Sequence, residues 1–191
     1  MENAQQSESQ EQDQQIFSAL SSNDLKIIPF IAQDDQWILP DSFLAMIWNQ
    51  TVEEGLAKTV FMERDMGLEQ FIFMVKNPRN LFGFVFKEQK CVGFAWLNRI
   101  DDNSAHAHFG LFQKTWGKSS DVIGKMFLDY WMTLGTDSEL LDVIFGVIPL
   151  HNKLAQAFVQ RIGFAYLGTI PGIIRVPGDK VSATIYYYLR R

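Results

Sequence analysis

The chain has 191 residues, of which 47% are hydrophobic, and this is enough for one compact domain with a sizeable core. Much of its formal charge of −5 comes from residues 1–15, because removing Glu2, Glu8, Glu11 and Asp13 from the 22 acidic residues leaves 18 against 17 basic ones. The nearly neutral remainder has no cluster of lysine and arginine, which argues against nucleic-acid binding by phosphate neutralisation.

The N-terminal segment differs in composition from the rest of the chain. Residues 1–15 hold six glutamines and four acids with almost no apolar side chains. Such a segment cannot bury enough surface to offset its loss of conformational entropy. We therefore expect a disordered leader over residues 1–22 and one folded domain over residues 23–191.

The single cysteine, Cys91, excludes an internal disulfide. It lies in an apolar strand pattern with no base placed near it in sequence, which favours a buried thiol over a nucleophile. The chain has no apolar leader and no apolar run of transmembrane length. These features predict a soluble cytoplasmic protein with no membrane partner.

The first elements of the predicted domain are one strand and a group of helices. Residues 27–31 suit a strand, and Pro29 favours an edge position in a sheet. Asp41 or Ser42 can cap a helix that carries apolar side chains at helical spacing. Further helical segments are expected near residues 51–63 and 67–76.

The rest of the chain is predicted to combine strands with two amphipathic helices. The first of these helices has Ser119 or Ser120 as its N-cap, and the second opens at His151-Asn152 and ends at residues 163–164. Apolar runs and alternation predict strands at residues 82–87, 91–97, 105–112, 142–149, 166–176 and 181–189, with turns at 88–90, 99–104 and 177–179.

The strand at residues 105–112, the loop at 113–119 and the next helix form a unit that can bind phosphate. A helix N-terminus leaves backbone N–H groups without partners, and Asp121 suits the positive end of the helix dipole. Gly117-Lys-Ser matches the end of a Walker A loop, but that motif needs a glycine where this chain has Phe112. We therefore reject a P-loop.

The same loop, Lys114-Thr-Trp-Gly-Lys-Ser119, resembles the pyrophosphate-binding loop of the GNAT acyltransferases, the Gcn5-related N-acetyltransferase superfamily. The pattern of that family is Arg or Gln, two residues, Gly, one residue, and then Gly or Ala. This loop is most similar to members that carry Trp-Gly-Lys-Gly there. Lys114 and Ser119 depart from the pattern.

A second segment is similar to the family's helix after the next strand. Asn152, Ala155 and Gly163-Phe fall in register with the family pattern, whereas the position that commonly holds tyrosine is Val159. The turn expected at residues 168–172 resembles that of GNAT-like proteins carried by phages. The resemblance covers roughly residues 24–191.

The resemblance implies an α/β protein of the GNAT fold, with a mixed, mostly antiparallel central sheet of about six to seven strands flanked by helices. It implies transfer of an acetyl group from acetyl-CoA, as co-substrate, to an amine acceptor of unknown identity. A strand end polarises the thioester carbonyl and pairs with pantetheine, while the loop binds pyrophosphate. The implied CoA-binding residues are Leu111, Phe112, Gln113, Lys114, Trp116, Gly117, Lys118, Ser119 and Asn152.

The family often uses a carboxylate on the central strand as the base, and aligning His108-Phe-Gly with the usual Glu-Ile-Gly puts His108 there. Imidazole suits this role at neutral pH, and His106 on the same strand face is a second choice. A structural role for both histidines is the alternative. Gly110 on that face is expected to leave room for the pantetheine.

Val159 cannot give a proton to the departing thiolate, and spacing selects none of the tyrosines at 166, 186, 187 and 188 as a substitute. In the family the acceptor lies against the early helices. Trp37, Trp48, Phe71 and Phe73 are therefore candidates to line its pocket, although core packing is expected for most of them.

The three histidines have no neighbouring ligands at metal-binding spacing, so no metal site is predicted. The sequence leaves the oligomeric state open, and a homodimer is one alternative. The competing interpretation is a weak or inactive member of the fold that serves as a structural or protein-interaction module.

Overall fold

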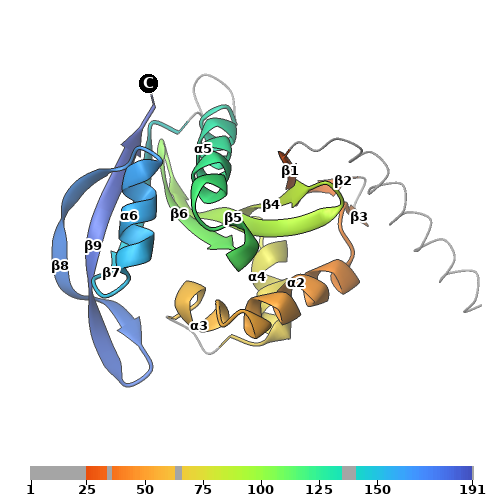
Figure 1. Cartoon of the computed structure of the whole chain (residues 1–191), viewed down its shortest axis with the longest axis horizontal. Helices are drawn as coiled ribbons and strands as arrows, with labels where there is room; N and C mark the ends of the chain where they lie inside the picture. The colour runs from red at the N-terminus through yellow and green to blue at the C-terminus, as the bar shows by residue number, and fades with distance from the viewer. Residues whose placement is uncertain (1–24, 34–35, 63–65, 135–140, 191) are drawn as a thin grey trace, which may run out of the picture.

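The computed structural model describes residues 25–33, 36–62, 66–134 and 141–190, and the predicted leader lies outside them. Its centre is a seven-stranded sheet with the order β1-β4-β5-β6-β7-β9-β8 (Figure 1). The pair β6 and β7 is parallel and the other pairs in this sheet are antiparallel. The strands are β1 (Leu25–Pro29), β4 (Leu81–Lys87), β5 (Lys90–Asp101), β6 (Ser104–Leu111), β7 (Val143–Pro149), β8 (Ala165–Val176) and β9 (Asp179–Leu189).

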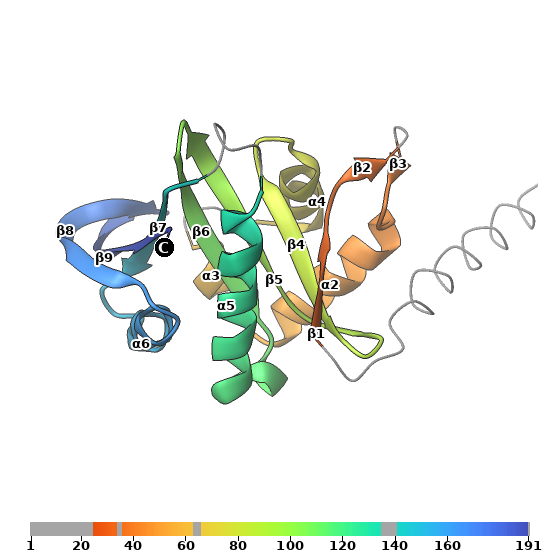
Figure 2. The ribbon, with the colours of Figure 1, turned by 90° about the horizontal axis from the view of Figure 1, so that it is seen from above.

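Helices cover both faces of this sheet (Figures 1 and 2). One face carries α2 (Asp41–Glu53), α3 (Ala57–Val60) and α4 (Leu68–Lys76), and the other carries α5 (Lys118–Met132) and α6 (Lys153–Arg161). A small separate hairpin joins β2 (Ala32–Gln33) to β3 (Gln36–Trp37). The expected mostly antiparallel sheet flanked by helices is therefore confirmed. None of the described helices is long and apolar enough to cross a membrane.

The two faces of β4 and β5 carry different side chains because successive residues of a strand point to opposite sides. The face toward α2, α3 and α4 is aromatic, and its rings stack on one another; the centroids of Phe82 and Trp96 are 5.0 Å apart. Trp48 and Phe71 belong to this core, as expected for most of the early aromatic residues. Phe73 is 75% exposed instead.

The opposite face is built from aliphatic strand residues and the apolar stripes of α5 and α6. Phe109 of β6 packs between them, with its ring centroid 5.6 Å from Trp131 and 5.3 Å from Phe158. A Cβ at Gly124 would lie 2.8 Å from the Phe158 ring and 3.0 Å from Ile162. The two helices therefore approach closely at this glycine.

The predicted N-caps of two helices are wrong. Pro40 is the N-cap of α2, and Asp41 is its first helical residue. Gly117 is the N-cap of α5 and has a φ of 90°, a conformation that favours glycine. Ser120 lies inside the first turn, where its hydroxyl donates to the Gly117 carbonyl at 2.6 Å. Asn152 does cap α6, since its Oδ1 accepts from the Ala155 N–H at 3.0 Å.

Two predicted turns are strand irregularities. Residues 168–172 lie within β8, where the register against β9 shifts between Ile170 and Ile174. The sequence predicts a turn at residues 99–104, but its first residues belong to a strand. β5 continues to Asp101 and has a bulge after Asn98. A bulge keeps the backbone in the sheet while it re-aims side chains, so local turn residues do not reveal it.

Candidate active site

The parallel strands β6 and β7 separate partway along their length. Their register pairs run from Ser104 opposite Val143 to His106 opposite Phe145, whereas β6 continues to Leu111 and β7 to Pro149. Beyond that point β6 stays paired with β5, and β7 stays paired with β9. The facing edges of β6 and β7 are therefore left without a ladder between them.

The backbone of β6 presents donors to this gap. The Phe112 N–H donates to the Val92 carbonyl on the β5 side at 3.2 Å. Because alternate residues of an antiparallel pair direct their N–H and C=O groups to the same edge, those of Phe109 and Leu111 point to the β7 side. The Leu111 carbonyl already accepts the Trp116 indole N–H at 2.9 Å. The N–H groups of Phe109 and Leu111, which lie beyond the last β6–β7 pair, are thus the donors that an extended ligand would meet.

A cleft of about 1780 Å³ opens at this separation. Its walls come from β6 and β7, from α3 and α4, and from α6 and β8. The predicted residues His106, His108 and Asn152 line it, whereas no described residue of the loop at 113–119 does. The space over Gly110 is filled by the Phe94 ring, which would lie 2.5 Å from an added Cβ. Gly110 therefore makes room for Phe94 rather than for a ligand.

His108 is held from two sides. Its ring stacks on Trp96 with centroids 4.5 Å apart and planes 10° from parallel. Its Nε2 lies 3.1 Å from Asn98 Oδ1. An amide oxygen only accepts, so the Nε2–H of His108 donates to Asn98. Asn98 and Trp96 were missed from sequence, although counting along the β5–β6 hairpin would place Trp96 opposite His108.

His106 lies at the point where the two strands part. Its ring centroid is 5.8 Å from that of Phe145 across the parallel pair. Burial lowers the pKa of His106 below its usual 6.5, and the Arg99 guanidinium lowers this pKa further. His106 therefore stays neutral at neutral pH and can accept or relay a proton.

The loop before α5 is exposed and lies beside the strand end. A short 3-10 helix spans Gln113–Thr115, and Gly117 then starts α5 with no heavy atom within 4 Å of an added Cβ. The side chains of Lys114, Lys118 and Ser119 are exposed, and Trp116 is 52% exposed. The backbone around Gly117 is thus accessible to a ligand at the helix N-terminus.

One donor of this loop is already engaged. The Gln113 N–H donates to Glu54 Oε2 at 2.6 Å, and the Gln113 amide nitrogen donates to the Glu54 carbonyl at 3.4 Å. These contacts tie the strand end to the C-terminus of α2, which sequence reasoning did not foresee. A ligand would pair with the Phe109 and Leu111 donors without displacing Glu54.

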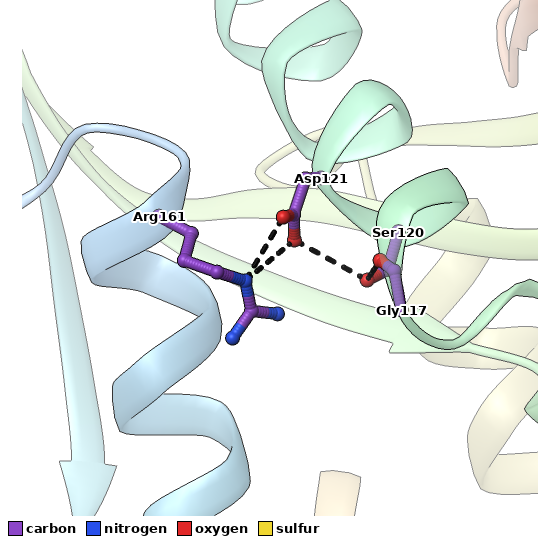
Figure 3. A network of polar contacts seen from close by, with 4 residues as sticks. All are labelled: Gly117, Ser120, Asp121 and Arg161. Atoms are coloured by element: carbon purple, nitrogen blue, oxygen red, sulfur yellow. Dashed lines mark hydrogen bonds and ion pairs between the residues drawn. The ribbon is translucent and has the colours of Figure 1, made fainter.

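An ion pair joins the start of α5 to the end of α6 (Figure 3). The Arg161 Nε donates to both carboxylate oxygens of Asp121, at 3.0 and 2.9 Å, and the contact lowers the pKa of Asp121. The terminal NH₂ groups of Arg161 have no hydrogen-bond partner among the described residues. This arginine, beside the exposed loop, is a candidate phosphate ligand that the motif did not indicate.

The cleft offers no phenol among its described lining residues. Val159 is buried in its wall, and none of the tyrosines considered as substitutes lines it. Tyr166 is exposed and contacts the Thr169 hydroxyl at 3.2 Å, and burial raises the pKa of Tyr186. The histidines are thus the cleft groups best suited to proton exchange near neutral pH.

Neither cysteine nor metal chemistry is indicated by the described part of the chain. Burial raises the pKa of the Cys91 thiol to about 12, although its S–H donates to the Gly93 carbonyl at 3.3 Å. The thiolate is therefore scarcely populated near neutral pH. No group of three or more metal-ligating side chains comes together within residues 25–33, 36–62, 66–134 and 141–190.

No family model and no curated protein matches this sequence. Solved structures match its fold with 13 to 19% identity. The spermidine N-acetyltransferase from Vibrio cholerae, in complex with CoA and spermine, is 16% identical with a TM-score of 0.66, over 88% of this chain and 96% of that one.

Two further acetyltransferases have the same fold. An enzyme from Salmonella typhimurium that modifies the N-terminal serine of a ribosomal protein is 13% identical with a TM-score of 0.69, over 89% of this chain and 97% of that one. The microcin self-immunity acetyltransferase MccE, in complex with acetyl-CoA and AMP, is 19% identical with a TM-score of 0.61. The match covers 78% of this chain and 87% of that one. The chain therefore has the fold of the GNAT acetyltransferases.

Proposed function

We propose that this protein is an acyl-CoA-dependent N-acyltransferase that moves the acetyl group of acetyl-CoA to an amine. The observation that carries the proposal is the separation of β6 from β7, with a cleft through it and two histidines on its wall. Similar structures with CoA or acetyl-CoA in complex lend support.

The residues present fit the pantetheine and phosphates of CoA. The β7-facing N–H groups of Phe109 and Leu111 suit an extended amide-containing arm, which would add to β6 as a strand does. The exposed backbone at Gly117 and the terminal NH₂ groups of Arg161 suit the phosphates. The cation of Arg161 also offsets the charge of Asp121, which would otherwise repel an anion.

The chain supplies the remaining chemistry from β5 and β6. Acetyl-CoA brings a thioester carbonyl, and a backbone N–H of β6 polarises its oxygen. His108 accepts a proton from the ammonium of the acceptor, which leaves a neutral amine to attack the carbonyl, while Trp96 and Asn98 hold the His108 ring. His106, neutral and half-buried at the parting of the strands, accepts the proton that His108 has taken up and passes it to the departing thiolate. Val159 has no proton to give to the thiolate. We therefore assign this role to the histidines, in place of the tyrosine that the family commonly has at this position.

Calorimetric titration with acetyl-CoA tests the proposal before any acceptor is known. We expect one acetyl-CoA to bind per chain, and a short acetyl thioester without the nucleotide to bind far more weakly, because it lacks the phosphates. A screen of amines with detection of the released thiol then tests transfer. Absence of acetyl-CoA binding would instead support a structural or protein-interaction module.

A further inference from the structure

The charged side chains among the described lining residues of the cleft are mostly cationic. Arg79, Arg99 and Arg175 line the cleft, and Glu69 is the acidic residue among its described lining residues. Among the described lining residues, three arginines against one glutamate leave an excess of two positive charges, before any histidine is protonated. A spermine-like polycation would meet repulsion at such a wall.

These guanidinium groups have no ion-pair partner among the described residues. Within the described residues, the ion pairs of the chain are Lys76 with Asp41 and Arg161 with Asp121. No carboxylate of the described part therefore neutralises the arginines of the cleft. Several arginines around one cavity suit recognition of a carboxylate or phosphate.

The backbone places Arg99 at the proton-transfer groups. Arg99 has a φ of 49° within the bulge of β5, and this conformation is uncommon for a residue with a side chain. Bulges of this kind re-aim side chains next to functional sites. Arg99 follows Asn98, the partner of His108, and its charge acts on the His106 ring.

Arg79 reaches the same cavity from the loop after α4. The turn that carries it is fixed by the Arg79 N–H, which donates to Asn77 Oδ1 at 3.0 Å. Phe73, one turn from the end of α4, lines the cleft with 75% of its surface exposed. This part of the cleft wall therefore combines the Arg79 cation with the exposed ring of Phe73.

We infer that the acceptor is an amine whose molecule also carries a carboxylate or phosphate, held by Arg99 and Arg79 while its amine faces His108. This inference rests on the proposed acetyl transfer and names its substrate class. The exposed Phe73 ring would contact an apolar part of the same molecule. The inference predicts that polyamines are not the preferred acceptors.

Matched pairs of amines test the inference. L-phenylalanine against L-phenylalaninamide examines a carboxylate, O-phosphoethanolamine against ethanolamine examines a phosphate, and spermidine is the polycation. With acetyl-CoA, we expect kcat/KM to favour the anionic member of at least one pair by tenfold or more. The pair that shows the preference identifies the anion.

Charge variants connect this preference to the cleft. Arg99→Gln and Arg79→Gln should each reduce it at least fivefold. Lys90→Gln, which removes the same charge from an exposed residue at the start of β5 outside the cleft, should leave the preference unchanged. Equal use of both members in both pairs, or a preference for spermidine, would overturn the inference.

Measuring acetyl-CoA binding distinguishes a failure of this inference from a failure of the proposed function. Turnover of spermidine as the best acceptor overturns the inference alone, whereas absence of acetyl-CoA binding overturns the proposed function. If no amine is turned over, the same pairs are titrated onto the protein by calorimetry. Tighter binding of an anionic member, weakened in Arg99→Gln but not in Lys90→Gln, supports the inference; equal binding overturns it.

Discussion

The loop at residues 113–119 and the strand β6 meet at one site but are built in different ways. The loop is largely exposed, and what it offers a ligand is backbone, made accessible by Gly117 at a φ of 90°. The histidine part of β6 offers side chains held by neighbours, with His108 stacked 4.5 Å from Trp96. A binding role can thus tolerate changes of loop side chains, whereas a proton-transfer role depends on the packing around one ring.

This difference predicts that changes in β6 alter turnover and that changes in the loop alter binding. The largest effect should come from His108→Ala, which removes the proposed base. We expect kcat/KM to fall by roughly 10²-fold or more, with little change in acetyl-CoA affinity. Thiol-release kinetics measure the first quantity and calorimetry the second.

His151→Ala is the matched control, because His151 is exposed and does not line the cleft. It should retain the activity of the unmodified protein. A His108→Ala protein that keeps its rate would make the histidine structural and move proton transfer to His106 or water.

A smaller effect is expected in the loop. Gly117→Val should weaken acetyl-CoA binding by more than tenfold, because a β-branched residue disfavours this backbone conformation and covers the N–H groups at the helix start. Gly178→Val is the control, since Gly178 also has a positive φ of 79° and open space around it, but lies in the β8–β9 turn. Equal affinity of the two variants would remove the phosphate role from the loop.

The smallest effect concerns pH. Because the pKa of His106 is lowered in the folded protein, the unfolded chain binds its proton first as the pH falls below about 6.5. This histidine therefore lowers stability as the pH drops through its folded pKa. The loss of Tm between pH 7 and 5 should be smaller in His106→Gln than in the unmodified protein.

Arg99→Gln should raise the pKa of His106 measured by NMR titration, because a neighbouring cation is removed. Lys90→Gln should leave it unchanged. A His106 pKa at or above its usual value in the unmodified protein would show that burial and Arg99 do not act on the ring as described.

The sequence was informative where a local pattern determines the structure. The strand, loop and helix around Gly117 follow from apolar spacing over a short segment, and the edge position of β1 follows from Pro29. The helix expected to open at His151-Asn152 is likewise present as α6, and the structure adds that Asn152 is its N-cap.

Other parts of the candidate site depend on contacts between distant segments. Glu54 reaches Gln113 from 59 residues away, and Arg161 reaches Asp121 from 40 residues away. The bulge that carries Arg99 depends on strand register rather than on turn residues. No pattern within one segment contains this information, because it arises when the sheet assembles.

Amide hydrogen exchange with and without acetyl-CoA tests the central claim most directly, because it reports where the molecule binds without needing an acceptor. Binding between β6 and β7 predicts slower exchange at the N–H groups of Phe109 and Leu111 and around Gly117, with no change in the β8–β9 turn at Gly178. Unchanged exchange in β6 and the loop, or protection confined to another part of the chain, would contradict the account.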